Sequence, residues 1–302
     1  MIKNLCVLLL AAWVVTGFPA IAAEPIRWAE LSQRPAPAAG AIHAYGTLAD
    51  QHGELRLPSG SGPFPVAVLL HGGCWLEDYD LAYFRHLAEA VTKLGWASWT
   101  VEYRRVGGAG GWPETFLDVA DALDYLTVLG QAQPLDLTNT IVVGHSAGAQ
   151  LALWAAQRDR IAEGHPLYRP QPLAVWHVLA LSPVLDLARY RIGPQNSCHG
   201  AVEPLMGGTP DTVPDRYASV SPIELLPVSV PVSLISGRDD PTVSAASVRR
   251  YFEHADSSRV SLALIDGAEH FDPAVPGSMA WPRVRARLLS LLPPAKKPGK
   301  NR

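Results

Sequence analysis

The sequence predicts an α/β domain built on a mostly parallel, eight-stranded sheet with helices on both faces and a lid-like insertion. Two observations predict this class. Short apolar runs alternate with longer segments of helical periodicity through most of the chain. One of these runs, residues 66–70, is continuously apolar instead of alternating, as in a strand covered on both faces. We therefore expect one domain over residues 41–293, without an internal linker.

The elements follow one another in a regular order. Strands are expected at residues 41–48, 53–58, 66–70, 97–103, 141–143, 174–182, 231–237 and 260–267. Polar turn residues separate the first two, which indicates a hairpin or a pair of edge strands. Helical spacing of apolar residues predicts helices at residues 81–94, 115–129, 149–157, 244–255 and 278–292. Gly95 is a plausible stop for the first of these helices.

Residues 185–228 interrupt this alternation. The segment is rich in Pro and Gly and contains no clear strand. A connection of this length in a compact domain is often a functional insertion. Because it lies between two strands near their carboxyl edge, we interpret it as a lid or pocket wall. The alternative is an irregular excursion into solvent.

The first 23 residues predict a secretory signal peptide. Lys3 precedes an apolar run of about 11 residues, which is too short for the roughly 20 helical residues that span a bilayer. A small-residue stretch follows, with cleavage expected after Ala22 or Ala23. We expect an exported protein, periplasmic or secreted, with no stable membrane insertion after cleavage. An uncleaved anchor is the alternative.

Two further segments flank the domain. Residues 24–40 are rich in Pro and Ala and are expected to form a leader segment, and residues 294–302 a disordered tail. The mature chain keeps two cysteines, Cys74 and Cys198. A disulfide is allowed in an exported protein, but two cysteines far apart in sequence do not establish one.

Composition excludes some classes of partner. The 302 residues are 48% hydrophobic and 18% charged, enough for one large α/β domain or two small ones. The formal charge is −3 and no Lys/Arg stripe is present, so we expect no nucleic-acid partner. No Cys/His cluster has the spacing of metal ligands, and we expect no metal. The oligomeric state is left open.

Ser146 is the candidate nucleophile. It stands between a β-branched run and an Ala/Leu-rich segment, with Gly144 and Gly148 two positions away on either side. On a sharp strand-to-helix turn the serine takes strained backbone angles, costing about 1–3 kcal/mol, and glycine removes the side chains that would crowd the turn. This geometry raises the hydroxyl above the sheet edge at the positive end of the next helix. The alternatives are a phosphate-type Gly-rich turn and a plain tight corner.

A serine hydroxyl needs a base, and position selects it among ten histidines. His270 follows the last expected strand, in a loop at the same carboxyl edge. A third group orients the imidazole and should follow the penultimate strand, where Asp239 and Asp240 stand. We choose Asp240, because the residues that start the next helix lie just beyond it. His145, beside the serine, is interpreted as structural.

The stretch HGGCW follows the strand expected beside the nucleophile strand. Its glycines allow backbone amides to face inward, as donors to a developing oxyanion. We predict an oxyanion hole formed by the amides of Gly73, Cys74 and Ala147; the loss of one such donor typically costs about 2.7–4 kcal/mol of transition-state stabilisation. His71 is expected to hold the loop and Trp75 to line the pocket. The alternative is an ordinary Gly-Gly loop.

With these motifs the chain resembles the α/β-hydrolase superfamily, in which nucleophile, acid and histidine follow the order of Ser146, Asp240 and His270. It is similar to the small esterases that include the bifunctional feruloyl and acetyl-xylan esterase-like group and the kynurenine formamidase-like proteins. The likeness spans roughly residues 45–290 and is carried by HGGCW, EYRRVGGAGGWPETFLDVADALDYL, GHSAGAQLAL and GAEHFD. It implies a Ser-Asp-His hydrolase with the α/β-hydrolase fold and no cofactor.

The chain departs from the family pattern at one position. Cys74 stands where relatives often have a third glycine or a bulky residue, which weakens the assignment of its amide as a donor. Arg104 and Arg105 lie in the family-like stretch, where they either anchor a loop or contact an acidic substrate. Anchoring is the favoured interpretation.

Together these observations predict an exported carboxylic-ester hydrolase for a small-molecule ester. Ser146 attacks the acyl carbon, His270 passes the proton to the leaving alcohol, Asp240 holds His270, and water releases the acyl-enzyme. A short acyl group is expected, because nothing indicates a long apolar tunnel. An aryl-formamide or peptide hydrolase uses the same machinery. A non-catalytic binding protein on this fold is the alternative of a different class.

Overall fold

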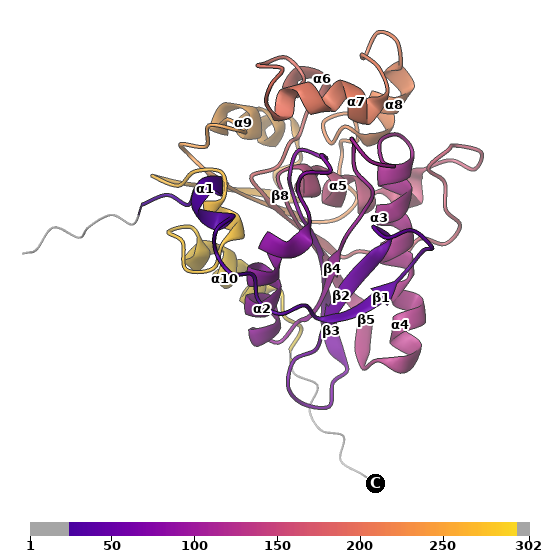
Figure 1. Ribbon diagram of the computed structural model, residues 1–302, viewed down its shortest axis with the longest axis vertical. Coiled ribbons are helices and arrows are strands. Elements are labelled where there is room, and N and C mark those ends of the chain that lie inside the picture. Colours follow the sequence, from indigo (N-terminus) through magenta and orange to yellow (C-terminus); the bar gives the residue numbers. More distant parts are fainter. Residues whose placement is uncertain (1–23, 295–302) are drawn as a thin grey trace, which may run out of the picture.

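The computed structural model describes residues 24–294 (Figure 1). The predicted signal peptide lies outside them, as does all but the first residue of the predicted tail. The sheet of the described chain has eight strands in the order β1-β2-β4-β3-β5-β6-β7-β8. Only β1 and β2 pair antiparallel to their neighbours, at one edge. The strands are β1 (Ala41–Ala44), β2 (His52–Arg56), β3 (Phe64–Leu70), β4 (Ala97–Val101), β5 (Leu135–His145), β6 (His177–Leu181), β7 (Val232–Gly237) and β8 (Val260–Ile265).

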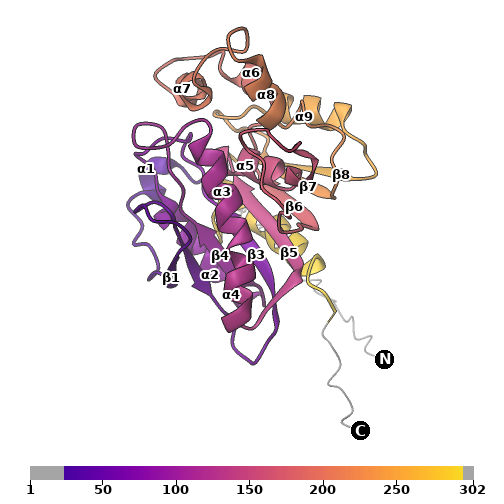
Figure 2. The same ribbon diagram turned by 90° about the vertical axis from the view of Figure 1, so that its right-hand side faces the viewer.

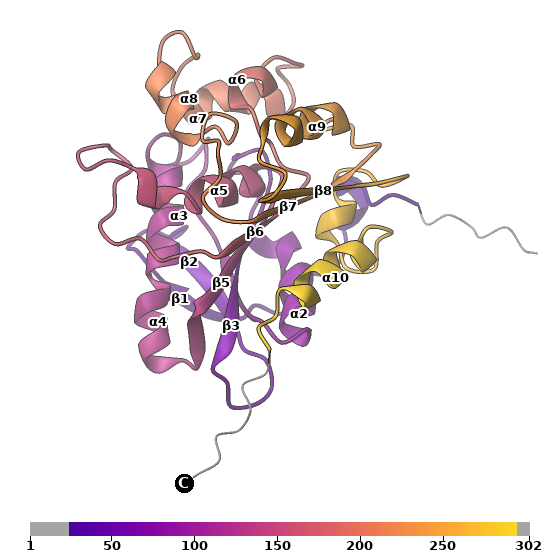
Figure 3. The ribbon, with the colours of Figure 1, turned by 180° about the vertical axis from the view of Figure 1, so that it is seen from behind.

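Helices cover both faces of the sheet. The α-helices of residues 24–294 are α1 (Trp28–Leu31), α2 (Arg85–Lys93), α3 (Glu114–Asp124), α4 (Leu126–Ala132), α5 (Ala147–Ala155), α6 (Leu187–Tyr190), α7 (Val202–Met206), α8 (Pro214–Val220), α9 (Ala245–His254) and α10 (Trp281–Ser290). Short 3-10 turns add η1 (Leu81–Phe84), η2 (Arg158–Arg160), η3 (Cys198–Ala201) and η4 (Asp272–Ala274). Figure 3 shows α3 and α4 on one side of the sheet and α2 and α10 on the other. The predicted mostly parallel sheet between two helical layers is confirmed.

Two hydrophobic cores explain the continuous apolar run of β3. Val66 and Val68 are buried with side chains of α3 and α5, whereas Ala67 and Leu69 are buried with side chains of α2 and α10. Successive side chains of a strand point to opposite faces, so a strand between two helical layers needs apolar residues at every position.

Helix boundaries follow the sequence with one exception. The helix expected at residues 81–94 begins as the 3-10 turn η1 and continues as α2, which ends before Gly95. Gly95 has a φ of 109°, which glycine tolerates best. The single helix expected at residues 115–129 is instead divided at Tyr125 into α3 and α4. The apolar periodicity runs through this division, so the pattern does not reveal it.

The insertion at residues 185–228 contains α6, η3, α7 and α8, and Figures 1 and 2 show these helices above the end of the sheet near α5 and α9. Val202, Leu205 and Met206 are fully buried in the core, so this segment is no loose excursion into solvent. A disulfide between Cys74 and Cys198 ties it to the loop after β3. No helix within residues 24–294 combines the length and the hydropathy needed to cross a bilayer.

Candidate active site

Ser146 lies on a sharp turn between β5 and α5. Its φ of 55° and ψ of −118° are unfavourable for a residue with a side chain, at a cost of about 1–3 kcal/mol. A Cβ on Gly144 would lie 2.2 Å from the carbonyl oxygen of Gly148. One on Gly148 would lie 2.1 Å from the carbonyl oxygen of Leu70. The turn therefore has the strained backbone that the sequence predicts, and both glycines are required by close backbone contacts.

His270 and Asp240 come from the loops after β8 and β7. The Nδ1 atom of His270 lies 2.8 Å from Oδ2 of Asp240, whose side chain is fully buried. The other carboxylate oxygen accepts the backbone N–H groups of Thr242 and Val243, each at 2.8 Å. Burial alone raises the pKa of Asp240, but His270 and these two amides more than offset it, so the pKa lies below its usual value. An ionised carboxylate thus faces the imidazole.

The neighbouring candidate, Asp239, points elsewhere. It is exposed, and its carboxylate accepts the backbone N–H of Gly267 at 3.0 Å. Ser146 and His270, by contrast, both line one cavity of about 200 Å³. No hydrogen bond joins the serine hydroxyl to the imidazole in the described chain. Such bonds are often long in free enzymes and tighten when substrate binds. The structure thus brings Ser146, Asp240 and His270 to one edge of the sheet, and leaves Asp239 outside.

Free backbone amides surround the cavity. Within residues 24–294, the backbone amides of Gly73, Cys74 and Ala147 donate no hydrogen bond. Gly73 and Cys74 line the cavity, and Ala147 directly follows Ser146 at the start of α5. Unpaired buried donors are uncommon, and amides aimed at a developing negative charge are their main catalytic use. These are the three amides that the sequence assigns to the oxyanion hole.

The cavity wall contains aromatic residues that the sequence did not assign. Trp28 of α1 lies with its ring 5.0 Å from that of Tyr79 and 5.7 Å from those of Tyr83 and Phe271. All four line the cavity. Phe271 adjoins His270, so its position could have been inferred. Nothing in the sequence indicates the position of Trp28, because it belongs to the expected leader segment and packs on Phe271, a residue near the other end of the described chain.

The structure corrects the predicted position of Trp75. The sequence predicts that it lines the pocket, but its ring is buried in the core and Nε1 donates to Oε1 of Gln150 at 3.1 Å. Cys74 and Trp75 both have φ near 57°, and Gly73 has a φ of 108°. These three left-handed residues reverse the chain, so the tryptophan ring is turned into the core.

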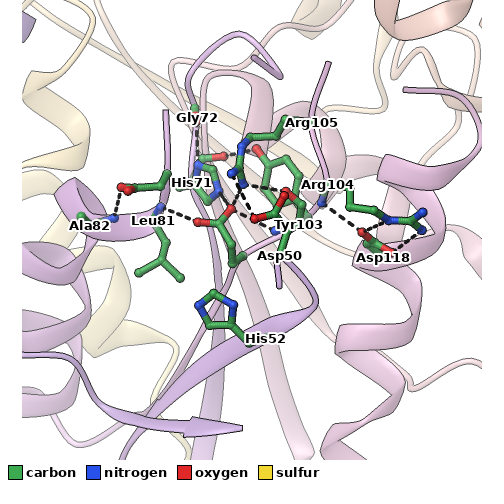
Figure 4. A network of polar contacts seen from close by, with 12 residues as sticks. Asp50, His52, His71, Gly72, Leu81, Ala82, Tyr103, Arg104, Arg105 and Asp118 are labelled. Carbon is green, nitrogen blue, oxygen red and sulfur yellow. Dashed lines mark hydrogen bonds and ion pairs between the residues drawn. The ribbon is translucent and has the colours of Figure 1, made fainter. Parts of the chain in front are cut away.

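A buried polar network supports residues 71–75, which contain two of the predicted oxyanion donors and are called the oxyanion loop below (Figure 4). His71 Nε2 lies 2.9 Å from a carboxylate oxygen of Glu102, and the Tyr103 hydroxyl donates to the His71 carbonyl at 2.8 Å. Arg105 forms an ion pair with Glu102. His71 therefore holds the loop, as expected. The backbone and guanidinium of Arg104 both bond to a separate carboxylate, that of Asp118, so both arginines are anchors.

No metal site accompanies these groups: among residues 24–294, no three or more His, Cys, Asp or Glu side chains are grouped so as to hold an ion.

Three buried histidines make stability depend on pH. Burial, together with Arg105, His270 and Arg287 respectively, lowers the pKa of His71, His145 and His177 to about 3. The unfolded chain binds these protons near pH 6.5, so stability falls as pH drops below that value. We expect the free energy of unfolding to be lower at pH 5.5 than at pH 7.5 by about 1.4 kcal/mol per histidine.

Urea titrations at the two pH values measure this difference. Both pH values lie above the pKa of most carboxyl groups, so carboxylates contribute little to it. His177→Gln keeps a polar group near Ser233 but removes one titration, so the difference should shrink by about 1.4 kcal/mol. An unchanged difference in this variant would contradict the assignment of His177 as a buried neutral residue.

Comparison with known proteins places the chain among esterases. A family model described as BD-FAE matches residues 54–253. None of the curated proteins compared with the chain matches it. A truncated carbohydrate esterase from gut microbiota has a TM-score of 0.70 at 17% identity, over 85% of this chain and 99% of that one. Esterase 2 of Thermogutta terrifontis, solved phosphonylated by sarin, has a TM-score of 0.70 at 18% identity, over 89% and 100%.

A longer protein, the bifunctional GH43-CE of Bacteroides eggerthii, has a TM-score of 0.66 at 20% identity over 82% of this chain. The chain spans 37% of that protein. These likenesses establish the α/β-hydrolase fold.

Proposed function

The chain belongs to the BD-FAE family of α/β-hydrolase-type esterases, and on that premise we propose that it hydrolyses small-molecule esters through an acyl-enzyme on Ser146. One observation carries the proposal. A strained serine and a histidine line the same cavity, and a buried carboxylate lies 2.8 Å from the far nitrogen of that histidine. Nucleophile, base and orienting acid are the three parts that serine hydrolases require.

Each group has a definite step in this mechanism. Ser146 Oγ attacks the acyl carbon while Nε2 of His270 takes its proton, and Asp240 stabilises the resulting imidazolium through Nδ1. The tetrahedral oxyanion then accepts hydrogen bonds from the free amides of Gly73, Cys74 and Ala147. His270 returns the proton to the leaving alcohol, which departs. Water, deprotonated by the same imidazole, hydrolyses the acyl-enzyme and restores the serine.

The size of the cavity supports a short acyl group. Its volume of about 200 Å³ is below the roughly 300–1,000 Å³ of pockets for drug-sized ligands. Its walls include the four aromatic rings and the disulfide, which bound the space beside Ser146. A larger open cavity of about 560 Å³ adjoins it at Cys74, Tyr79, Cys198 and Thr242, and we assign that space to the alcohol part of the ester. The structural relative from Thermogutta terrifontis has been solved with propionate and with butyrate bound. We propose acyl groups of two to four carbons for this chain.

A panel of p-nitrophenyl esters tests both parts of the proposal. We expect kcat/KM for the acetate or butyrate to exceed that for the octanoate by about 10–100-fold, because methylene groups without room lose binding energy in the transition state. The leaving group is constant across the panel, so the ratio reports the acyl site alone. A maximum at the octanoate would contradict the short-acyl proposal and leave ester hydrolysis standing.

The same assay separates the competing functions. N-formylkynurenine and short peptides test the formamidase and peptidase alternatives, since these substrates use the same machinery with another leaving group. A higher kcat/KM on either one than on every ester would replace ester hydrolysis as the function. A fluorophosphonate probe should label the peptide that contains Ser146. Absence of labelling, with no turnover of any substrate, would favour a binding protein.

A further inference from the structure

His145 precedes the nucleophile and takes no part in the chemistry proposed above. Its side chain is buried, and both ring nitrogens have partners. Nε2 lies 3.0 Å from the backbone carbonyl oxygen of His270, and Nδ1 lies 2.9 Å from the hydroxyl of Tyr83. The Tyr83 oxygen also accepts the backbone N–H of Gly72 at 2.7 Å. We call this series of contacts, from Gly72 through Tyr83 and His145 to His270, the His145 chain.

Every hydrogen bond in the His145 chain has one possible direction. A carbonyl oxygen can only accept, so Nε2 of His145 carries a hydrogen and donates it to His270. Burial, aided by the nearby His270, lowers the pKa of His145 to about 3, so the ring is neutral at ordinary pH and has no second hydrogen. Nδ1 is therefore an acceptor, and the Tyr83 hydroxyl donates to it.

The two ends of the His145 chain reach the groups that must be placed around the nucleophile. Gly72 directly precedes Gly73, which lines the cavity and whose amide donates no hydrogen bond. The other end is the carbonyl of His270, the residue whose ring is the proposed base. His145 lies between these two ends and directly precedes Ser146 in the chain. Oxyanion donors and base are thus both held relative to the serine.

Gly72 is closely packed against the His145 chain. A Cβ there would lie 2.9 Å from the His145 carbonyl oxygen, 3.0 Å from the Tyr83 hydroxyl and 3.1 Å from Nδ1 of His145. The oxyanion loop therefore rests directly against the His145 chain. Catalytic geometry is sensitive at this scale, since a displacement of about 1 Å can cost about 10²-fold in rate.

We propose that His145 is a positioning residue, which fixes the base through the His270 carbonyl and the oxyanion loop through Tyr83. This inference rests on the proposed function and deepens it. The two halves of the His145 chain serve different steps of the reaction. The base must protonate the leaving alcohol, whereas the oxyanion donors act on the acyl group whatever the alcohol.

Two substitutions separate the halves. His145→Asn places an amide oxygen where Nδ1 accepts from Tyr83, but the side chain is too short to reach the His270 carbonyl, so the base loses its support. Tyr83→Phe keeps the aromatic ring beside Trp28 and removes the hydroxyl, so the oxyanion loop loses its hydrogen bond while Nε2 of His145 still donates to the His270 carbonyl. Tyr251→Phe is the matched control, because Tyr251 is also buried and its hydroxyl has no partner in the described chain.

The test compares kcat and KM on p-nitrophenyl acetate, whose leaving group needs no proton, with those on ethyl acetate, whose alkoxide does. For His145→Asn we expect kcat on ethyl acetate to fall about 10²-fold. On p-nitrophenyl acetate we expect the factor of loss in kcat to be at least ten times smaller, and KM should be nearly unchanged on both esters. For Tyr83→Phe we expect a loss of about tenfold, equal on both esters. Tyr251→Phe should match the wild type.

A purely structural role for His145 predicts a different result. Partial unfolding lowers the active fraction, so both esters lose the same factor. Equal losses for His145→Asn, or values within twofold of wild type for both variants, would overturn the inference. Failure of the proposed function looks different again: wild type would then hydrolyse neither ester faster than Ser146→Ala. Should one variant fail to fold, the other still tests its own half.

Discussion

Ser146→Ala is expected to lower kcat for p-nitrophenyl acetate by about 10⁴–10⁶-fold. The hydroxyl is the only atom that can carry the acyl group in the proposed mechanism, and an alanine methyl cannot replace it. The oxyanion amides and the cavity are untouched, so a small residual rate above that of water should survive. The measurement is steady-state hydrolysis by the purified protein, with fluorophosphonate labelling of wild type and variant in parallel.

The matched control is Ser236→Ala. Ser236 also lies near the carboxyl end of a parallel strand, β7, is fully buried, and its hydroxyl has no partner in the described residues. Because it does not line the cavity, its removal should leave kcat close to that of wild type. Equal rates for wild type and Ser146→Ala would remove the serine from the mechanism, whatever the control does.

The sequence predicts the elements and residues whose signals are local. The apolar runs of the central strands indicate a two-sided sheet because each face needs its own apolar residues. Ser146 stands out because its two glycines are demanded by backbone contacts within a few residues of the turn or across one neighbouring strand. His270 and Asp240 are suggested by their places after the last two strands, since the carboxyl ends of parallel strands meet at one edge.

What the sequence does not predict depends on distant packing. The contact between Tyr83 and His145 joins residues 62 positions apart, and nothing near either residue indicates it. Trp28 reaches the cavity by packing on rings from other parts of the chain. The Cys74–Cys198 disulfide could not be predicted from the sequence, because its formation depends on how the insertion folds back over the loop after β3. The position of Trp75 was predicted wrongly because Cys74 and Trp75 both have positive φ angles. Residue types other than glycine do not indicate such backbone angles.

Asp240→Asn is the second prediction of large effect, and we expect kcat to fall about 10⁴-fold with little change in KM. The reason lies in the two amides that already occupy Oδ1. Thr242 and Val243 both donate to that oxygen, so an asparagine must keep its carbonyl oxygen there. Its amide group then faces Nδ1 of His270. Nδ1 must accept, the ring hydrogen moves to Nε2, and the base can no longer take the proton of Ser146.

Asp239→Asn provides a closely matched control, because it makes the same chemical change one residue away. Asp239 is exposed and bonds to Gly267 without reaching His270, so this variant should stay within about twofold of wild type. Kinetics of both variants, with urea titrations to confirm that each is folded, decide the matter. If the two variants behave alike, the carboxylate does not set the tautomer of His270, and the orienting role must be given to another group.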